Sequence, residues 1–114
     1  MYKVIVFLKK RDGLSREEFV DYYENRHVPL ILSMAPSPPI YRRNYLVPEG
    51  SASDGFDFDV MVEFGFADKA AHQEWVAQMD RPENRQQNDD DSPNLFHPDS
   101  LEIREYVLEE HITS

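Results

Sequence analysis

His27 is the side chain in this sequence best placed for acid–base chemistry. It belongs to a stripe of residues that recur at steps of three and four, and so share one face of a predicted helix: Phe19, Tyr23, His27, Leu30 or Ile31, and Met34. An imidazole titrates near neutrality, and apolar walls keep it available as a base. We therefore expect His27 to be a general base that lines a pocket between this helix and a sheet. The alternative is a core imidazole bonded to the Asn25 carbonyl, which Pro29 leaves without its helical donor.

A base in a dry aromatic pocket supports chemistry that needs no cofactor. A phenolic or 1,3-dicarbonyl compound that loses a proton becomes an enolate, which can react with oxygen, lose a carboxyl group or eliminate water. The residues that could donate hydrogen bonds to such an anion are Tyr23, Tyr41, Arg42, Arg43, Asn44 and Tyr45. Tyr41, Arg43 and Tyr45 share one face of a predicted strand. That face either holds an oxyanion against the helices or forms an interface with a partner.

Further aromatic and imidazole side chains are candidates for the pocket wall. His72 and Trp75 lie on the stripe of a second predicted helix, either as pocket wall or as core. Phe96 and His97 fall in a predicted long loop, 81–99, where they could close the pocket as a lid. The candidate substrate-binding residues are therefore Tyr23, Tyr41, Tyr45, Trp75, Phe96 and His97.

The sequence excludes many other chemistries. It has no Gly-rich nucleotide loop, no Gly-x-Ser-x-Gly elbow, no His-Glu-x-x-His pair and no cysteine. Its four histidines are far apart, so we expect no metal and no cofactor; a site built from His27, His72 and a carboxylate is the alternative. The Asp89–Asp91 run lacks the spacing of a calcium loop and is typical of a solvated turn.

Composition narrows the class of protein. A length of 114 residues predicts a single domain, 1–114, with a frayed tail at 109–114. The net charge of −10 argues against nucleic acid as a partner. No apolar run is long enough for a membrane span, and the absence of cysteine favours a cytoplasmic protein.

The elements that must position these residues follow from periodicity and from start and stop signals. Ser15 and Glu18 have the spacing of a capping box, which starts the first helix, and Asp68 caps the second. Pro29 predicts a kink or restart near His27. The predicted strands are 2–9, 40–48, 56–66 and 100–108, and the predicted helices are 16–34 and 69–80.

This order, β-α-β-β-α-β, predicts an α+β ferredoxin-like fold: a four-stranded antiparallel sheet with two helices on one face. The first and last predicted strands are apolar on both sides, while two helices cover only one. The uncovered face should therefore meet a second copy of the chain, as a homodimer.

Four segments resemble the EthD family of the dimeric α/β-barrel superfamily. They are the N-terminal strand Tyr2–Leu8, the entry Lys10–Phe19, the helix Tyr22-Tyr23…His27-Val28-Pro29-Leu30, and the later Asp91-Ser92-Pro93…Phe96-His97-Pro98-Asp99. The resemblance implies two ferredoxin-like subunits packed sheet to sheet as a dimeric barrel. It also associates the chain with oxidoreductase or lyase activity in degradation or aromatic polyketide pathways, with cofactor-free oxidation, decarboxylation or dehydration of phenolic substrates. The helix histidine carries over to His27.

Three functions are compatible with these observations. The first is a cofactor-independent tailoring or catabolic enzyme that acts on a hydrophobic, phenolic or polyketide-like aromatic, with His27 as its base. The second is a non-catalytic protein that binds such a molecule, which requires only the aromatic lining. The third is an accessory subunit of a separate oxygenase, which predicts a further exposed apolar patch outside the dimer interface.

Overall fold

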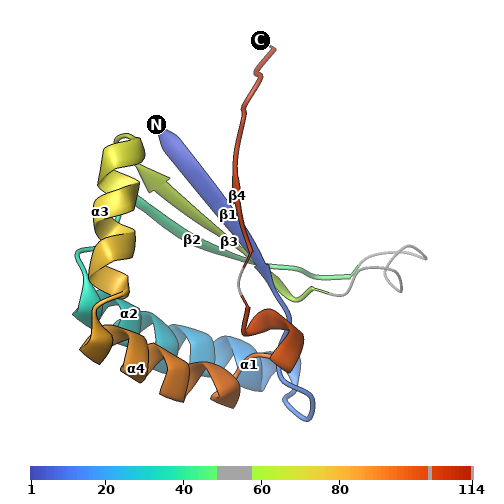
Figure 1. Ribbon diagram of the computed structural model, residues 1–114. Coiled ribbons are helices and arrows are strands. Elements are labelled where there is room, and N and C mark those ends of the chain that lie inside the picture. The colour runs from blue at the N-terminus through green and yellow to red at the C-terminus, as the bar shows by residue number, and fades with distance from the viewer. Residues whose placement is uncertain (49–57, 103, 114) are drawn as a thin grey trace.

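The computed structural model of the protein describes residues 1–48, 58–102 and 104–113. Its antiparallel sheet has the strand order β2-β3-β1-β4, and the helices lie on one side of it (Figure 1). The strands are β1 (Tyr2–Leu8), β2 (Ile40–Tyr45), β3 (Val60–Phe66) and β4 (Glu105–Val107); the helices are α1 (Arg16–Tyr22), α2 (Val28–Met34), α3 (Lys69–Met79) and α4 (Pro82–Asp91). The predicted ferredoxin-like α+β fold is confirmed, with α4 added to the two predicted helices. None of the described helices is long and apolar enough to cross a membrane.

The strand registers divide the sheet into a helix side and an outer side. Val4 and Val6 of β1 pair with Phe64 and Val62 of β3 on the helix side, where most of the buried core lies. Tyr41, Arg43 and Tyr45 of β2 pair with Phe64, Val62 and Val60, so their shared face also points toward the helices. Of the two orientations left open by the sequence, the structure therefore selects the one facing the helices.

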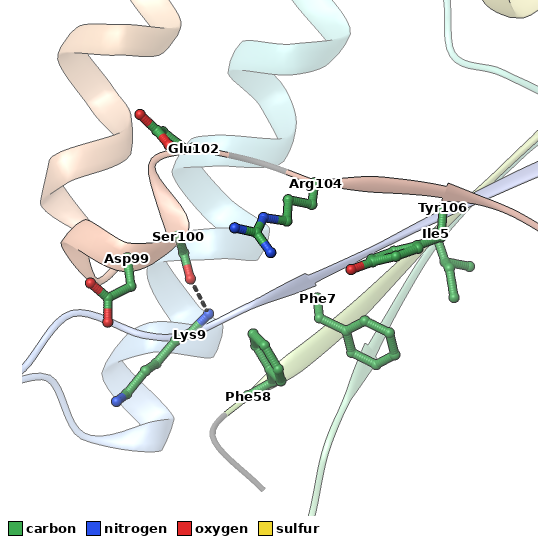
Figure 2. Close-up of a pocket in the computed structure, with 9 residues that line it drawn as sticks. All are labelled: Ile5, Phe7, Lys9, Phe58, Asp99, Ser100, Glu102, Arg104 and Tyr106. Carbon is green, nitrogen blue, oxygen red and sulfur yellow. Dashed lines mark hydrogen bonds between the residues drawn. The ribbon is translucent and has the colours of Figure 1, made fainter.

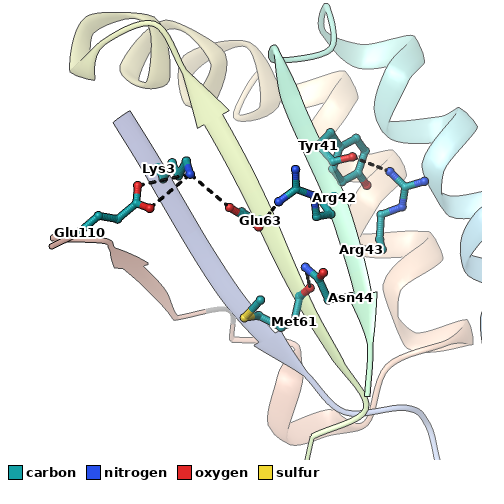
Figure 3. A network of polar contacts seen from close by, with 8 residues as sticks. All are labelled: Lys3, Tyr41, Arg42, Arg43, Asn44, Met61, Glu63 and Glu110. Atoms are coloured by element: carbon teal, nitrogen blue, oxygen red, sulfur yellow. Dashed lines mark hydrogen bonds and ion pairs between the residues drawn. The ribbon is translucent and has the colours of Figure 1, made fainter. Parts of the chain in front are cut away.

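The outer side mixes ion pairs with apolar side chains. Glu63 lies 3.8 Å from Lys3 and 3.1 Å from Arg42, and Lys3 also pairs with Glu110 (Figure 3). Ile5 pairs with Tyr106 of β4 on the same side. None of the described helices covers this face, in agreement with the two-sided apolar pattern of β1.

The first helix is built as predicted, including its interruption. The Ser15 hydroxyl accepts from the Glu18 backbone N–H, and the Glu18 carboxylate accepts from the Ser15 N–H, which completes the capping box. After α1 the chain makes one π-helical turn, η1 (Tyr23–His27), and α2 restarts at Val28 with Pro29 in its first turn. Pro29 has no N–H to donate, so the predicted restart next to His27 is confirmed.

The predicted loop 81–99 is wrong, because most of this segment is helical. It forms α4 and two short 3-10 turns, η3 (Ser92–Asn94) and η4 (Pro98–Ser100). Polar contacts hold α4, which has no apolar stripe for periodicity to detect: the Asn84 amide donates to the carbonyls of Met34 and Gln78. The Asp89–Asp91 run ends this helix and is not a solvated turn.

The lid interpretation of this segment also fails. Leu95 and Phe96 are fully buried members of the core cluster, so they are not free to open and close over a pocket.

All four predicted strands are shorter in the structure, β1 by a single residue at its C-terminal end. β2 ends at Tyr45, and β4 begins only at Glu105, because η4 occupies the start of the predicted strand 100–108. β3 begins at Val60, where the Asp59 carboxylate accepts from the Lys10 backbone N–H and caps the strand end. Positions 56 and 57 of the predicted third strand lie outside the described residues. The tail 109–113 carries no helix or strand and extends away from the body (Figure 1).

Ser15→Ala should lower the free energy of unfolding by about 1 kcal/mol, because it removes the side-chain half of the capping box. Urea unfolding of the purified protein measures this. Ser33→Ala is the matched control: Ser33 lies inside α2, where alanine has the better helix propensity, so stability should stay equal or rise slightly. Equal losses in the two variants would contradict a specific role for the cap.

Candidate functional site

A cavity of about 90 Å³ lies between the sheet and the helices. It brings together five of the residues singled out in the sequence: Tyr23, His27, Tyr41, Trp75 and Phe96. Its remaining described lining consists of Val6, Leu8, Ile31, Phe64, Met79, Asn88, Ser92 and Glu105. Residues from both ends of the chain thus converge on one aromatic pocket.

His27 is 5% exposed and is enclosed by aromatic rings. Its ring meets Tyr23 edge to face at a centroid distance of 5.2 Å, and Phe96 at 5.5 Å. Tyr23 and Phe96 also contact each other at 5.7 Å. The imidazole therefore sits in the low-dielectric environment that the helical stripe predicts.

The partner of His27 is a carboxylate. Its Nδ1 lies 2.8 Å from Oδ2 of Asp91, at the end of α4. The other oxygen of Asp91 accepts from the Tyr22 hydroxyl at 2.6 Å, and the Asn94 amide donates to that hydroxyl at 3.3 Å. The alternative in which His27 bonds to the Asn25 carbonyl is wrong, because the imidazole turns toward α4.

This arrangement sets the charge of Asp91. Burial on its own would raise the pKa of the Asp91 carboxyl, but the Tyr22 hydroxyl and the His27 ring lower it below its usual value. Asp91 is therefore ionised at neutral pH. Since an ionised carboxylate only accepts, the proton of a neutral His27 lies on Nδ1, and Nε2 keeps its lone pair.

The environment also keeps the His27 ring neutral. Burial lowers the pKa of His27 below its usual value, and Asp91 opposes this only in part. Among the described residues, no side-chain nitrogen or oxygen is buried without a hydrogen-bond partner. Nε2 is therefore not sealed in the core, and it can take a proton from a molecule in the cavity.

One ion pair, Arg43–Glu24, contacts both Tyr41 and Tyr45. Arg43 binds Glu24 with two hydrogen bonds of 3.0 and 2.7 Å, and its guanidinium lies 4.7 Å from the centre of the Tyr41 ring. The Tyr45 hydroxyl donates to Glu24 at 2.5 Å. Burial raises the pKa of Tyr41 to about 12 and that of Tyr23 well above its usual value, so both hydroxyls serve as donors and not as bases.

The far wall of the cavity comes from α3 and β4. Trp75 lines it and packs on Phe64 at 5.2 Å. His72 lies one turn away against Phe66, and its Nε2 is 3.4 Å from the Glu105 carboxylate, which itself lines the cavity.

Two of the predicted pocket residues lie elsewhere. Tyr45 does not line the cavity, because its hydroxyl is turned to Glu24. His97 does not line it either: its Nδ1 accepts from the Asp99 backbone N–H and caps η4, so the ring serves the local turn.

Sequence reasoning missed Asp91 and Glu105, the two carboxylates of the site. Asp91 follows His27 by 64 positions, and only the docking of α4 joins them. Its run of aspartates was visible, but no periodicity placed it on a helix. Glu105 shows no signal beyond its alternation with Tyr106 on a strand.

A second and larger cavity, of about 640 Å³, lies on the outer side of the sheet (Figure 2). Ile5, Phe7, Phe58 and Tyr106 form its apolar part, and charged or polar residues form its rim: Lys9, Asp99, Ser100, Glu102 and Arg104. It holds no histidine among the described residues and no acid–base pair comparable to His27–Asp91. No group of three or more His, Asp or Glu side chains that could hold a metal occurs in the described part of the chain.

Solved structures share this fold. An ethyl tert-butyl ether D (EthD) family protein of Bacillus halodurans is 20% identical, with a TM-score of 0.62 over 97% of this chain and all of the other. A protein of Arabidopsis thaliana is 13% identical, with a TM-score of 0.64 over 100% and 99% of the two chains. HapK of Hahella chejuensis is 14% identical, with a TM-score of 0.62 over 100% and 96%. At these identities the likeness concerns the fold alone.

No curated protein matches the chain in sequence. The EthD domain, however, matches residues 11–99, which run from the turn before α1 to η4 and include every residue of the His27–Asp91 contact. This match covers well over half of the chain, and the protein therefore belongs to the EthD domain family.

Proposed function

We propose that this protein binds a hydroxylated aromatic compound in the helix-side cavity and that His27 removes a proton from it, without a resident cofactor. The observation that carries this proposal is the contact of a buried, aromatic-walled imidazole with an ionised carboxylate, 2.8 Å away. Asp91 orients the ring and fixes its tautomer, and Nε2 is left as the base. The resulting phenolate or enolate is an electron-rich anion that can react with oxygen, lose a carboxyl group or eliminate water.

The cavity as it stands is too small for a multi-ring substrate. Its volume of about 90 Å³ corresponds to roughly three water molecules, and a cavity that holds benzene needs ~150 Å³. α3 is a wall that can move at low cost, because none of its described side chains is fully buried. Substrate entry thus requires α3 to shift with Trp75.

A non-catalytic binding protein is the second candidate, and the aromatic lining of the cavity is the observation that favours it. Binding uses the aromatic lining and the tyrosine hydroxyls but makes no demand on Nε2 of His27. The two functions can be distinguished by measuring the turnover of a variant that still binds the ligand. The third function, an accessory subunit of an oxygenase, would require neither ligand binding in this cavity nor turnover.

We also propose that the outer side of the sheet is covered by a second copy of the chain. Phe58 and Tyr106 are 39% and 53% exposed there, beside the 640 Å³ cavity. Apolar side chains gathered on an open sheet face are typical of an interface between subunits.

His27→Gln should keep the fold and the binding of a phenolic ligand while turnover falls by about 10²–10⁴-fold, because glutamine can donate to Asp91 but cannot act as a base. A thermal-shift screen of phenolic compounds selects the ligand, and its consumption measures turnover. His111→Gln, on the exposed tail, is the control and should behave as wild type. Wild-type turnover in His27→Gln would refute His27 as the base, and ligand binding without measurable turnover in the wild type would favour the binding-protein function.

The pKa of His27, measured by NMR of the ring protons, should lie below 6.5 and should fall further in Asp91→Asn, since Asp91 raises it. The unfolded chain then binds the proton more readily than the folded one. His27 therefore contributes stability that is complete above pH 6.5 and is lost as the pH falls through the lowered value. A His27 pKa at or above 6.5 in the wild-type protein would contradict the proposal that burial keeps this imidazole neutral.

Sedimentation equilibrium at micromolar concentration should give a mass twice the 13.4 kDa of one chain. Tyr106→Glu should shift the equilibrium toward the monomer, because it places a charge in the apolar outer face. Leu32→Glu is the control: Leu32 is 45% exposed on α2, in the helical layer on the other side of the sheet, and its variant should remain dimeric. A wild-type monomer would refute the dimer.

A further inference from the structure

The charges around the helix-side cavity have one sign. Among the described residues that line it, Glu105 is the one acidic side chain, and neither lysine nor arginine contributes. Its carboxylate is 42% exposed, which puts it at the mouth, on the same side of the sheet as Val6. A ligand that enters therefore passes a carboxylate before it reaches His27.

His72 and His27 do not make the charge around the cavity positive. His72 pairs with Glu105 at 3.4 Å, and His27 pairs with Asp91 at 2.8 Å. With the carboxylates ionised, each pair is neutral if its imidazole is protonated and negative if it is not. The pairs thus supply no net positive charge in either state of the rings.

The nearest guanidinium is also compensated. Arg43 lies over the Tyr41 ring, but its Nε and Nη2 both donate to Glu24. Arg43 Nη1 donates to the Tyr41 carbonyl, so all three nitrogens have partners. Among the described residues of this pocket, an anionic ligand would find hydroxyl donors but no free cation to offset its lost hydration.

We propose that the cavity selects uncharged, hydroxyl-bearing aromatic ligands over aromatic carboxylates, and that Glu105 is the residue responsible. This inference rests on the proposed function and narrows its substrate class. Glu105 accepts a hydrogen bond from a ligand hydroxyl and repels a ligand carboxylate. Of the three reactions open to an enolate, the selection favours oxidation and dehydration over decarboxylation, whose substrate would arrive as an anion.

The test uses two probes of nearly equal shape. 3,5-Dihydroxybenzamide and 3,5-dihydroxybenzoate share ring and hydroxyls and differ in charge, so the small volume of the cavity affects both alike. NMR titrations of the full-length protein at neutral pH give both dissociation constants, followed at the Trp75 indole N–H. The wild type should bind the benzamide at least about tenfold more tightly than the benzoate, a difference equivalent to about 1.4 kcal/mol.

Glu105→Gln should reduce this preference to less than about threefold, mainly by strengthening benzoate binding. Glu109→Gln is the matched control, because Glu109 is 92% exposed on the tail beyond β4, and it should keep the wild-type ratio. Should Glu105→Gln fold poorly, Glu105→Thr makes the same comparison with a side chain suited to a strand.

The outcomes separate the two proposals. If both probes bind equally to the wild type, the charge selection is refuted, and if the ratio survives in the Glu105 variants, the role of Glu105 is refuted; in either case the pocket remains a binding site. If neither probe perturbs Trp75, the binding of small hydroxylated rings is refuted, and the proposed function fails together with the selection. Loss of the preference in the Glu105 variants alone supports the inference.

Discussion

The hydrogen bond between His27 and Asp91 is the contact on which the helical layer depends. A buried imidazole without a partner costs folding free energy, and α4 brings that partner to it. α4 itself buries little apart from Asn84, so directed polar bonds hold it where apolar packing cannot. The same bond places the proton of His27 on Nδ1. One contact thus docks a helix and sets the tautomer of a buried imidazole.

The alternation of side chains along the strands separates the residues of the helix-side cavity from those of the outer face. Because successive side chains point to opposite faces, Glu105 and Tyr106 serve different surfaces, although they are neighbours in the chain. Glu105 looks into the helix-side cavity, and Tyr106 belongs to the outer face with Phe7 and Ile5 (Figure 2). A shift of β4 by one residue would exchange the two roles. The register of a three-residue strand therefore controls the charge of the site.

Around the helix-side cavity, the guanidinium of Arg43 and the imidazoles of His27 and His72 are each bound to a carboxylate. Arg43 binds Glu24, His27 binds Asp91 and His72 binds Glu105. These pairs arrange the tyrosine hydroxyls and the imidazole without adding net positive charge. Such a pocket is suited to stabilise charge that develops on a neutral ligand, through hydroxyl donors, and is poorly suited to attract an anion.

Local sequence patterns were sufficient to predict the overall fold of the protein. The capping box at Ser15, the restart at Pro29 and the stripe through Phe19, Tyr23 and His27 were predictable, because each depends on residues within two turns of one another. The ferredoxin-like order followed from the same signals. α4 was missed because its polar sequence has no periodic stripe, and its stability comes from contacts with distant segments. Asp91 and Glu105 became part of the site only through the docking of α4 and the pairing of β4 with β1, since hydrogen bonds and charges act across space and not along the chain.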